Sequence, residues 1–354
     1  MTLNRPPRVL LAYHIRPMTA GRMFQEAFRQ AGCETRVIGP HTQTCYGYTE
    51  AGQHREHEFP ASDWLLPDIE VEKGPHQVSQ PHDVMDLLRF MRVEGWAPDL
   101  VVFIDQLDMF HLVGEADIPF VAVCVENWGE LYAQRYTQQR LAAHFHMIAH
   151  QHDCAPPPLP PESEWMAFGF DPQIHRFMPT VVRDKWAVQI GTGYTPRPQV
   201  WNHLRAAFDG APPHSDEEYL RGCAESDHTI FGRLPSYREM AVAHNRARVA
   251  LSSSNCDFSP MRTCEAYGMG CILASDDVKA IRDVLGPPSS EGGFWIAHDR
   301  SPEGHETAVR EGVARYDELI DRGMAHVFRK HTYRNRAERI LAKVGIEGAF
   351  RLAW

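Results

Sequence analysis

Hydrophobic positions in the first half of the chain alternate between two spacings. A continuous apolar run at 8–12 predicts a buried strand, and the apolar residues that follow over 20–31 lie on one face of a helix. Thr19 is expected to cap this helix and Gly32 to end it. The same criteria predict a helix at 84–91 and strands at 35–38, 100–104 and 119–125.

The alternation starts again after a proline-dense stretch at 155–161 and Pro179. The second half is expected to hold strands at 186–190, 228–232, 248–253 and 271–275, and helices at 198–208, 236–246, 260–269 and 277–285. Helical spacing returns over 301–344. Alternating strands and helices indicate an α/β protein with two Rossmann-like parallel-sheet domains whose strand ends face a cleft. We expect a first domain at 1–175, a second domain at 176–330 and a closing helix at 331–354.

Composition narrows the class of protein. The chain has 354 residues, of which 43% are hydrophobic and 23% charged, as in folded globular proteins, and no apolar run is long enough to span a membrane. The eight cysteines form no C-x-x-C pair, and the first residues resemble a strand more than a signal peptide. We therefore expect a cytoplasmic protein. A formal net charge of −10 favours small-molecule chemistry over nucleic-acid binding.

The most informative segment is VALSSSNCDFSPMRTCEAYGMGCILAS, residues 249–275. Ser259 is expected to cap a helix whose first position is Pro260, so that free backbone N–H groups meet a phosphate at the end of a strand. Arg262 adds a positive charge for the same anion. Asp257 and Glu265 offer carboxylates to paired hydroxyls, as in a sugar or a ribose.

This segment resembles the acidic-x7-Glu signature of GT-B glycosyltransferases, E-G-F-G-x-P-x-x-E-A-M-A-x-G. Residues 167–179, 186–199 and 331–341 are similar to other parts of that family, and the group that looks closest is the spore-maturation-protein-like glycosyltransferases. The resemblance implies a nucleotide-sugar donor, by family habit UDP-linked, and retention of anomeric configuration. It also implies that Asp257 contacts the sugar and Glu265 the ribose. Asp257 is one methylene shorter than the usual Glu.

The donor-binding residues expected from the segment and the resemblance lie in three regions. Arg197 follows the turn G-T-G-Y-T-P at a strand end, which is expected to bring its guanidinium to the diphosphate. In the resembling family, backbone groups at the position of Arg233 hold the base. The complete set is Gly193, Arg197, Arg233, Leu234, Phe258, Ser259, Pro260, Met261, Arg262 and Glu265.

The first domain supplies candidates at strand ends. His14 and Asp105 each follow an apolar strand and are candidates, with Asp257, for a catalytic base or sugar contact. Arg16, Glu126 and Asn127 are candidates for the acceptor side. A polar residue at a strand end is more often a turn former than a catalyst.

No metal or cofactor is expected. Histidines between His144 and Cys154 do not have the spacing of structural zinc sites, and no D-x-D pair is present to hold a metal on a diphosphate.

Other functions stay open at this point. The acceptor could be a small molecule, a glycan or a modified base in phage-type DNA. A sugar-nucleotide epimerase and a non-enzymatic binding protein would use the same architecture.

Overall fold

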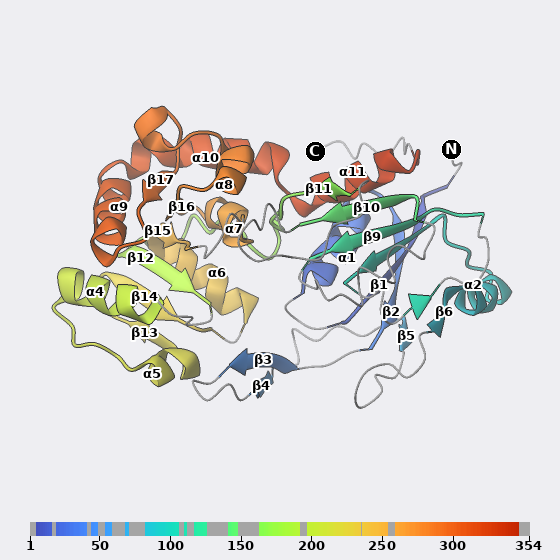
Figure 1. The fold of residues 1–354 in the computed structure, drawn as a ribbon, viewed down its shortest axis with the longest axis horizontal. Coiled ribbons are helices and arrows are strands. Elements are labelled where there is room, and N and C mark those ends of the chain that lie inside the picture. Colours follow the sequence, from blue (N-terminus) through green and yellow to red (C-terminus); the bar gives the residue numbers. More distant parts are fainter. Residues whose placement is uncertain are drawn as a thin grey trace. The chain divides into compact units, whose positions relative to one another are not determined.

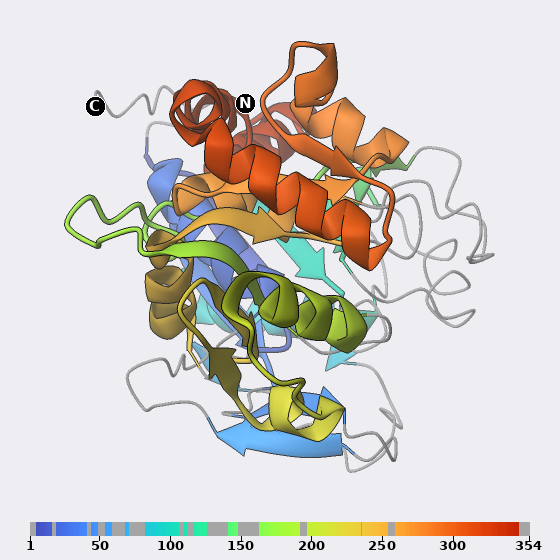
Figure 2. The same cartoon turned by 90° about the vertical axis from the view of Figure 1, so that its left-hand side faces the viewer.

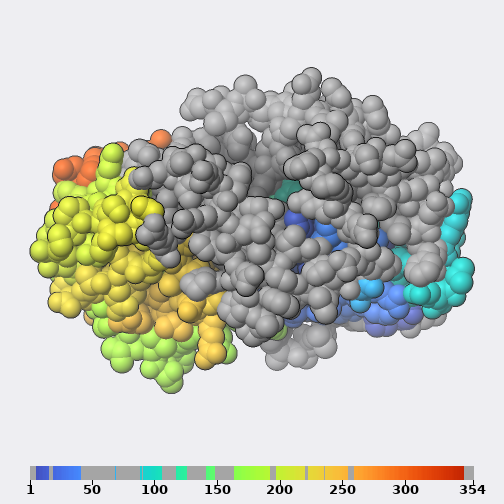
Figure 3. Space-filling model, turned by 90° about the horizontal axis from the view of Figure 1, so that it is seen from below, coloured from blue at the N-terminus to red at the C-terminus, as the bar shows by residue number. Residues whose placement is uncertain are grey.

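The computed structural model describes most of the chain. The described residues are 5–15, 19–40, 44–48, 54–58, 68–70, 82–105, 110–111, 117–125, 141–147, 163–191, 197–234, 236–253 and 259–346. The rest is drawn in grey in Figure 3.

The described part of the first half consists mainly of strands, whereas strands and helices alternate through much of the second half (Figure 1). In the first half they are β1 (Arg8–Tyr13), α1 (Ala20–Gln30), β2 (Glu34–Gly39), β3 (Thr44–Tyr48), β4 (His54–Glu58), β5 (Ile69–Glu70), β6 (His82–Asp83), α2 (Val84–Val93), β7 (Leu100–Ile104), β8 (Phe110–His111), β9 (Phe120–Cys124), β10 (Ala143–His146) and β11 (Glu164–Trp165). In the second half they are β12 (Lys185–Ile190), α4 (Arg197–Asp209), α5 (Asp216–Arg221), β13 (Cys223–Glu225), β14 (Thr229–Gly232), α6 (Tyr237–Arg246), β15 (Ala247–Leu251), α7 (Arg262–Gly268), β16 (Ile272–Asp276), α8 (Lys279–Leu285), β17 (Ile296–His298), α9 (Pro302–Ala314), α10 (Tyr316–Lys330) and α11 (Tyr333–Lys343).

The chain forms two compact units that are not continuous in sequence. The first unit combines residues 1–43, 64–167 and 333–354, and the second combines 44–63 and 168–332. The last helix, α11, therefore belongs to the first unit, where it packs against α1. An edge-to-face contact joins Phe24 of α1 to Tyr333 of α11, with ring centroids 5.2 Å apart.

The first unit is built on a sheet with the strand order β11-β10-β9-β7-β1-β2-β5. All of its pairings are parallel. Strands β7 and β9 are central in this sheet, each with a parallel neighbour on both sides, and both are buried along their whole length. Thr19 caps α1 by accepting a hydrogen bond from the N–H of Arg22, and Gly32 follows with φ of 84°. Both predictions for this helix are confirmed.

The second unit is built on a sheet with the order β13-β14-β12-β15-β16-β17. Its pairings are parallel except that of the short edge strand β13, which runs antiparallel to β14 and was not predicted. Helices α4 and α9 contact each other and lie side by side on one face of this sheet (Figure 2). Helix α6 packs on β12 and β15, and α7 on β16.

The predicted α/β class and the parallel sheets are confirmed, and the strands of the second unit lie within a few residues of their predicted bounds. In the described part of the chain, no helix combines the length and apolar character needed to cross a membrane.

Candidate functional site

Two central strands of the second unit, β12 and β15, end beside an arginine. Arg197 is the first residue of α4, and its Nη2 lies 3.5 Å from the backbone oxygen of Ser253, two residues after β15. Its Nη1 packs over Gly191 at the end of β12, where an added Cβ would lie only 3.5 Å away. The guanidinium therefore lies at the carboxyl ends of two neighbouring parallel strands, the usual place for a ligand in an open α/β sheet.

A second arginine reaches the same sheet edge from α7. Nη2 of Arg262 donates to the backbone oxygen of Ile190, the last residue of β12, at 2.7 Å. Its Nη1 donates to Nε2 of His244 at 2.7 Å, and its Nε lies 3.6 Å from Oε2 of Glu265. A guanidinium has five N–H groups. Within the described residues, Nη1 and Nη2 each donate one hydrogen bond, and Nε faces a carboxylate at ion-pair distance.

The partner His244 is neutral. Its Nδ1 lies 2.8 Å from the backbone oxygen of Met240, which can only accept, so Nδ1 carries the proton and Nε2 is free to accept from Arg262. Burial, with the positive charge of Arg262, lowers the pKa of His244 to about 3. His244 therefore orients the arginine without adding charge to the site.

Glu265 is the negative charge of this cluster. The side chain is 4% exposed, and its Oε1 lies 3.2 Å from Nε2 of His175. Burial alone would raise the pKa of Glu265, but the histidine and Arg262 outweigh that effect and lower it to about 2. Glu265 is therefore ionised at neutral pH in spite of its burial.

His175 is held in one tautomer by a tight turn. The backbone N–H of Asp171 donates to its Nδ1 at 3.1 Å, and the N–H of His175 returns a bond to the oxygen of Asp171 at 2.7 Å. Because Nδ1 accepts, the ring proton is on Nε2, which faces Glu265. Sequence reasoning missed both His175 and His244, since neither has a spacing relation to Glu265 that a motif would reveal.

The start of α7 corrects one prediction. Ser259 does not cap this helix: the helix begins at Arg262, and the cap position is Met261, whose side chain makes no capping bond. A preceding turn, in which the N–H of Thr263 bonds to the oxygen of Pro260, takes the place of the predicted first helical turn. At its other end, Gly270 follows α7 with φ of 77°, which lets the chain turn tightly into β16.

The other predicted donor residues are partly described. The N–H of Arg233 bonds to the oxygen of Gly222 at 3.0 Å, which fixes the backbone just after β14. Leu234 follows it. Gly193, Asp257 and Phe258 lie outside the described residues.

In the first unit, two predicted residues follow neighbouring strands. His14 comes directly after β1 and is buried, and Asp105 comes directly after β7. Asp105 has φ of 55°, a conformation that non-glycine residues rarely adopt, and its Oδ1 accepts the N–H of Val125 at 2.6 Å. The carboxylate thus ties the end of β7 to the end of β9. Arg16, Glu126 and Asn127 lie outside the described residues.

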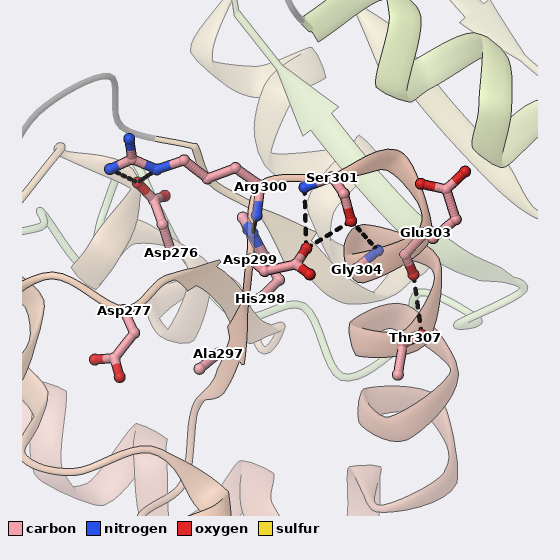
Figure 4. A pocket seen from close by; sticks show the side chains of 10 residues that line it. All are labelled: Asp276, Asp277, Ala297, His298, Asp299, Arg300, Ser301, Glu303, Gly304 and Thr307. Carbon is pink, nitrogen blue, oxygen red and sulfur yellow. Dashed lines mark hydrogen bonds and ion pairs between the residues drawn. The ribbon is translucent and has the colours of Figure 1, made fainter.

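A hollow of about 720 Å³ lies at the carboxyl ends of β16 and β17 (Figure 4). Its charged walls are largely paired: Asp276 accepts from Arg300, while the carboxylate of Asp299 accepts from the backbone and hydroxyl of Ser301. Among the described residues, no group of three or more His, Cys, Asp or Glu could hold a metal ion.

Comparison with known proteins agrees with this architecture. Residues 210–342 match the family model described as "Glycosyl transferase-like". A comparison with curated proteins finds no significant match. The protein carries a glycosyltransferase-like domain on a GT-B fold.

Solved structures share the fold at low sequence identity. A glycosyltransferase from Rickettsia africae is 9% identical with a TM-score of 0.61, and the match covers 96% of this chain and 98% of that one. The Anabaena protein HepE, solved with UDP and glucose, is 9% identical with a TM-score of 0.57, covering 96% and 99%. A sucrose-phosphate synthase from Thermosynechococcus elongatus is 12% identical with a TM-score of 0.56, covering 95% and 97%.

The glycosyltransferase-like domain contains only part of the cluster. Arg262, Glu265 and His244 lie inside the matched residues, whereas His175 and Arg197 precede them. The contacts of His175 and Arg197 therefore connect the matched domain to segments before it.

Proposed function

We propose that the protein is a glycosyltransferase that binds a nucleotide-sugar donor, UDP-linked, at the carboxyl ends of β12 and β15. The observation that carries this proposal is the anchoring of Arg262. Hydrogen bonds to β12 and α6 and an ion pair within α7 hold its guanidinium at the end of β12. Among the described residues, each Nη nitrogen has one acceptor, which leaves its second N–H for an anion. A planar guanidinium with fixed direction suits the oxygens of a diphosphate.

Sugar transfer from such a donor releases a nucleoside diphosphate, so negative charge develops on the leaving group. Arg262 and Arg197 would meet that charge with donors that are already in place, which lowers the barrier. This charge stabilisation would replace the divalent metal that other glycosyltransferases use. We therefore propose metal-independent catalysis, and the resemblance of residues 257–270 to the GT-B signature supports retention of configuration.

Glu265 would accept hydrogen bonds from the ribose hydroxyls. Its low pKa supports this role, because an ionised carboxylate only accepts and paired hydroxyls donate. The resemblance of residues 257–270 to the GT-B signature implies that Asp257 would contact the transferred sugar. His14 and Asp105 of the first unit, with Arg16, Glu126 and Asn127, are proposed for the acceptor, whose class is a small molecule, a glycan or a modified base.

Calorimetric titration with UDP, ADP, GDP and dTDP tests the donor site directly. We expect one of them, UDP first, to bind in the micromolar range, and Glu265→Ala to weaken that binding. Incubation with the UDP-sugar alone then separates the enzyme classes, since a transferase only hydrolyses its donor slowly while an epimerase converts it to another nucleotide sugar. Absence of binding by all four diphosphates would overturn the proposal.

A further inference from the structure

Two buried histidines hold the two residues that follow β15. Nε2 of His298, the last residue of β17, lies 3.0 Å from the backbone oxygen of Ser252. Nε2 of His305, in α9, lies 2.9 Å from Oγ of Ser253. The two rings pack together with centroids 3.8 Å apart. The two residues after β15 are thus held by α9 and by β17, two strands away in the sheet, just before the segment that contains Asp257.

The proton positions follow from the outer partners of the two rings. The N–H of Arg300 donates to Nδ1 of His298, so that ring carries its proton on Nε2 and donates to Ser252. Nδ1 of His305 lies 2.8 Å from the backbone oxygen of Ser301, which only accepts, so that ring carries its proton on Nδ1. Its Nε2 must therefore accept the hydroxyl proton of Ser253.

The close packing disfavours a charge on both rings at once, because two like charges at this separation would repel. Burial lowers the pKa of His298 to about 3 and also lowers the pKa of His305. His305 is 1% exposed, so it cannot itself reach a ligand. Its effect on any ligand must pass through Ser253.

Ser253 connects this pair to the proposed donor site. Its hydroxyl is held by His305 and its backbone oxygen accepts from Nη2 of Arg197 at 3.5 Å. An anchored hydroxyl fixes the direction of the carbonyl of the same residue, and the carbonyl limits where the guanidinium can lie. The chain of contacts therefore runs from α9 through Ser253 to the start of α4.

We propose that His305 is a positioning residue for the donor's diphosphate: it holds Ser253, and through the carbonyl of Ser253 it holds Arg197. This inference rests on the proposed function, because it assumes a nucleoside diphosphate at the ends of β12 and β15. It gives α9 a role in donor binding, although α9 lies outside the acidic-x7-Glu segment.

The test compares UDP with uridine, which lacks the phosphates, in binding titrations followed by calorimetry or NMR. His305→Phe keeps the ring volume but loses the acceptor, and should weaken UDP binding about tenfold while leaving uridine binding unchanged. His305→Gln offers an amide oxygen to Ser253 and should restore most of the affinity. His326→Phe is the matched control, since His326 also bonds a backbone oxygen, that of Val284, at another place in the same unit.

Ser253→Ala tests the same contact from its other side, at a half-buried residue. It should weaken UDP binding by a similar factor, and adding His305→Phe to it should cause no further loss, because both changes break one contact. Additive losses, or equal weakening of UDP and uridine, would overturn the inference and leave a structural role. If Arg197→Ala weakens UDP binding but His305→Phe does not, this inference fails alone. If the unmodified protein binds no nucleoside diphosphate, the proposed function fails and this inference with it.

Discussion

Nε2 of His175 lies 3.2 Å from Oε1 of Glu265, and both side chains are almost completely buried. His175 precedes β12, the first strand of the six-stranded sheet in chain order, and Glu265 lies in α7, which follows the fourth strand of that sheet, β15. The contact therefore joins the two ends of a long chain segment at one carboxylate. Because a buried carboxylate is costly unless it is paired, the histidine and Arg262 together keep Glu265 ionised.

His175→Phe should destabilise the protein by about 1–3 kcal/mol, since it removes the polar nitrogen that lies 3.2 Å from the buried carboxylate of Glu265. The measurement is urea denaturation at pH 7. His175→Gln, which can keep a donor near Glu265, should lose less. His203→Phe serves as a control, because His203 bonds a half-exposed carboxylate, that of Glu306. Equal stability of His175→Phe and the unmodified protein would show that the contact contributes nothing.

Glu265→Gln should remove a pH-dependent part of the stability. The pKa of Glu265 is about 2 in the folded protein and near 4.5 in the unfolded chain, so the folded state favours the ionised form. That stabilisation is fully present above pH 4.5 and is lost as the pH falls toward 2. The stability difference between the unmodified protein and Glu265→Gln should therefore be constant from pH 8 to 6 and shrink from pH 4.5 downward. A difference that stays constant down to pH 3 would contradict the assignment.

The fold of the second unit is largely predictable because each element carries its own signal. The apolar run of β12 and the helical spacing of α6 are local patterns, and both elements lie where those patterns predicted them. The N-cap at Ser259 was wrong although Ser-Pro is a common helix start, because the chain makes a separate turn before Arg262. Strand β13 was missed since three residues are too few for a period to show.

The candidate site was predictable only where its residues are close in sequence. Arg262 and Glu265 were found because they share one short helix, and Arg197 because it follows a glycine-containing turn. His175, His244 and His305 were missed, since their partners come from other elements and a buried histidine has no fixed spacing from the group it orients. Residues of this kind can be identified only from the folded structure, in which the sheet brings the ends of separate strands together.

Arg262→Ala should lower turnover more than donor affinity. In the proposed function its guanidinium stabilises charge that grows on the leaving diphosphate, so its loss should reduce kcat about a hundredfold and change the donor Kd only a few-fold. Because the acceptor is not identified, kcat is measured as the rate of slow donor hydrolysis. Arg282→Ala is the control, because Arg282 is on α8 and pairs with Asp277 and Glu291 away from this cluster. Thermal denaturation of both variants separates a catalytic loss from unfolding.

Chelation tests the proposal that arginines replace a metal. Donor hydrolysis and UDP binding should be unchanged after treatment with EDTA and after addition of Mg²⁺ or Mn²⁺, because Arg262 and Arg197 already supply the positive charge. A loss of activity with EDTA that Mn²⁺ restores would show that a metal binds the diphosphate. Arg197→Ala adds a useful comparison, since a metal that rescues only this variant would support the charge argument.

Gly270→Ala and Gly345→Ala separate backbone strain from crowding. Both glycines have positive φ, 77° and 71°, so each substitution should cost about 1 kcal/mol through strain alone. An added Cβ at Gly345 meets nothing within 4 Å, whereas at Gly270 it would lie 2.1 Å from the guanidinium of Arg183 and 2.7 Å from the ring of Phe177. Gly270→Ala should therefore destabilise the protein by at least 1 kcal/mol more than Gly345→Ala in urea denaturation. Arg183 is held in place by hydrogen bonds to the backbone oxygens of Ala247 and Met269. Equal losses in the two variants would mean that Arg183 nevertheless moves aside without cost.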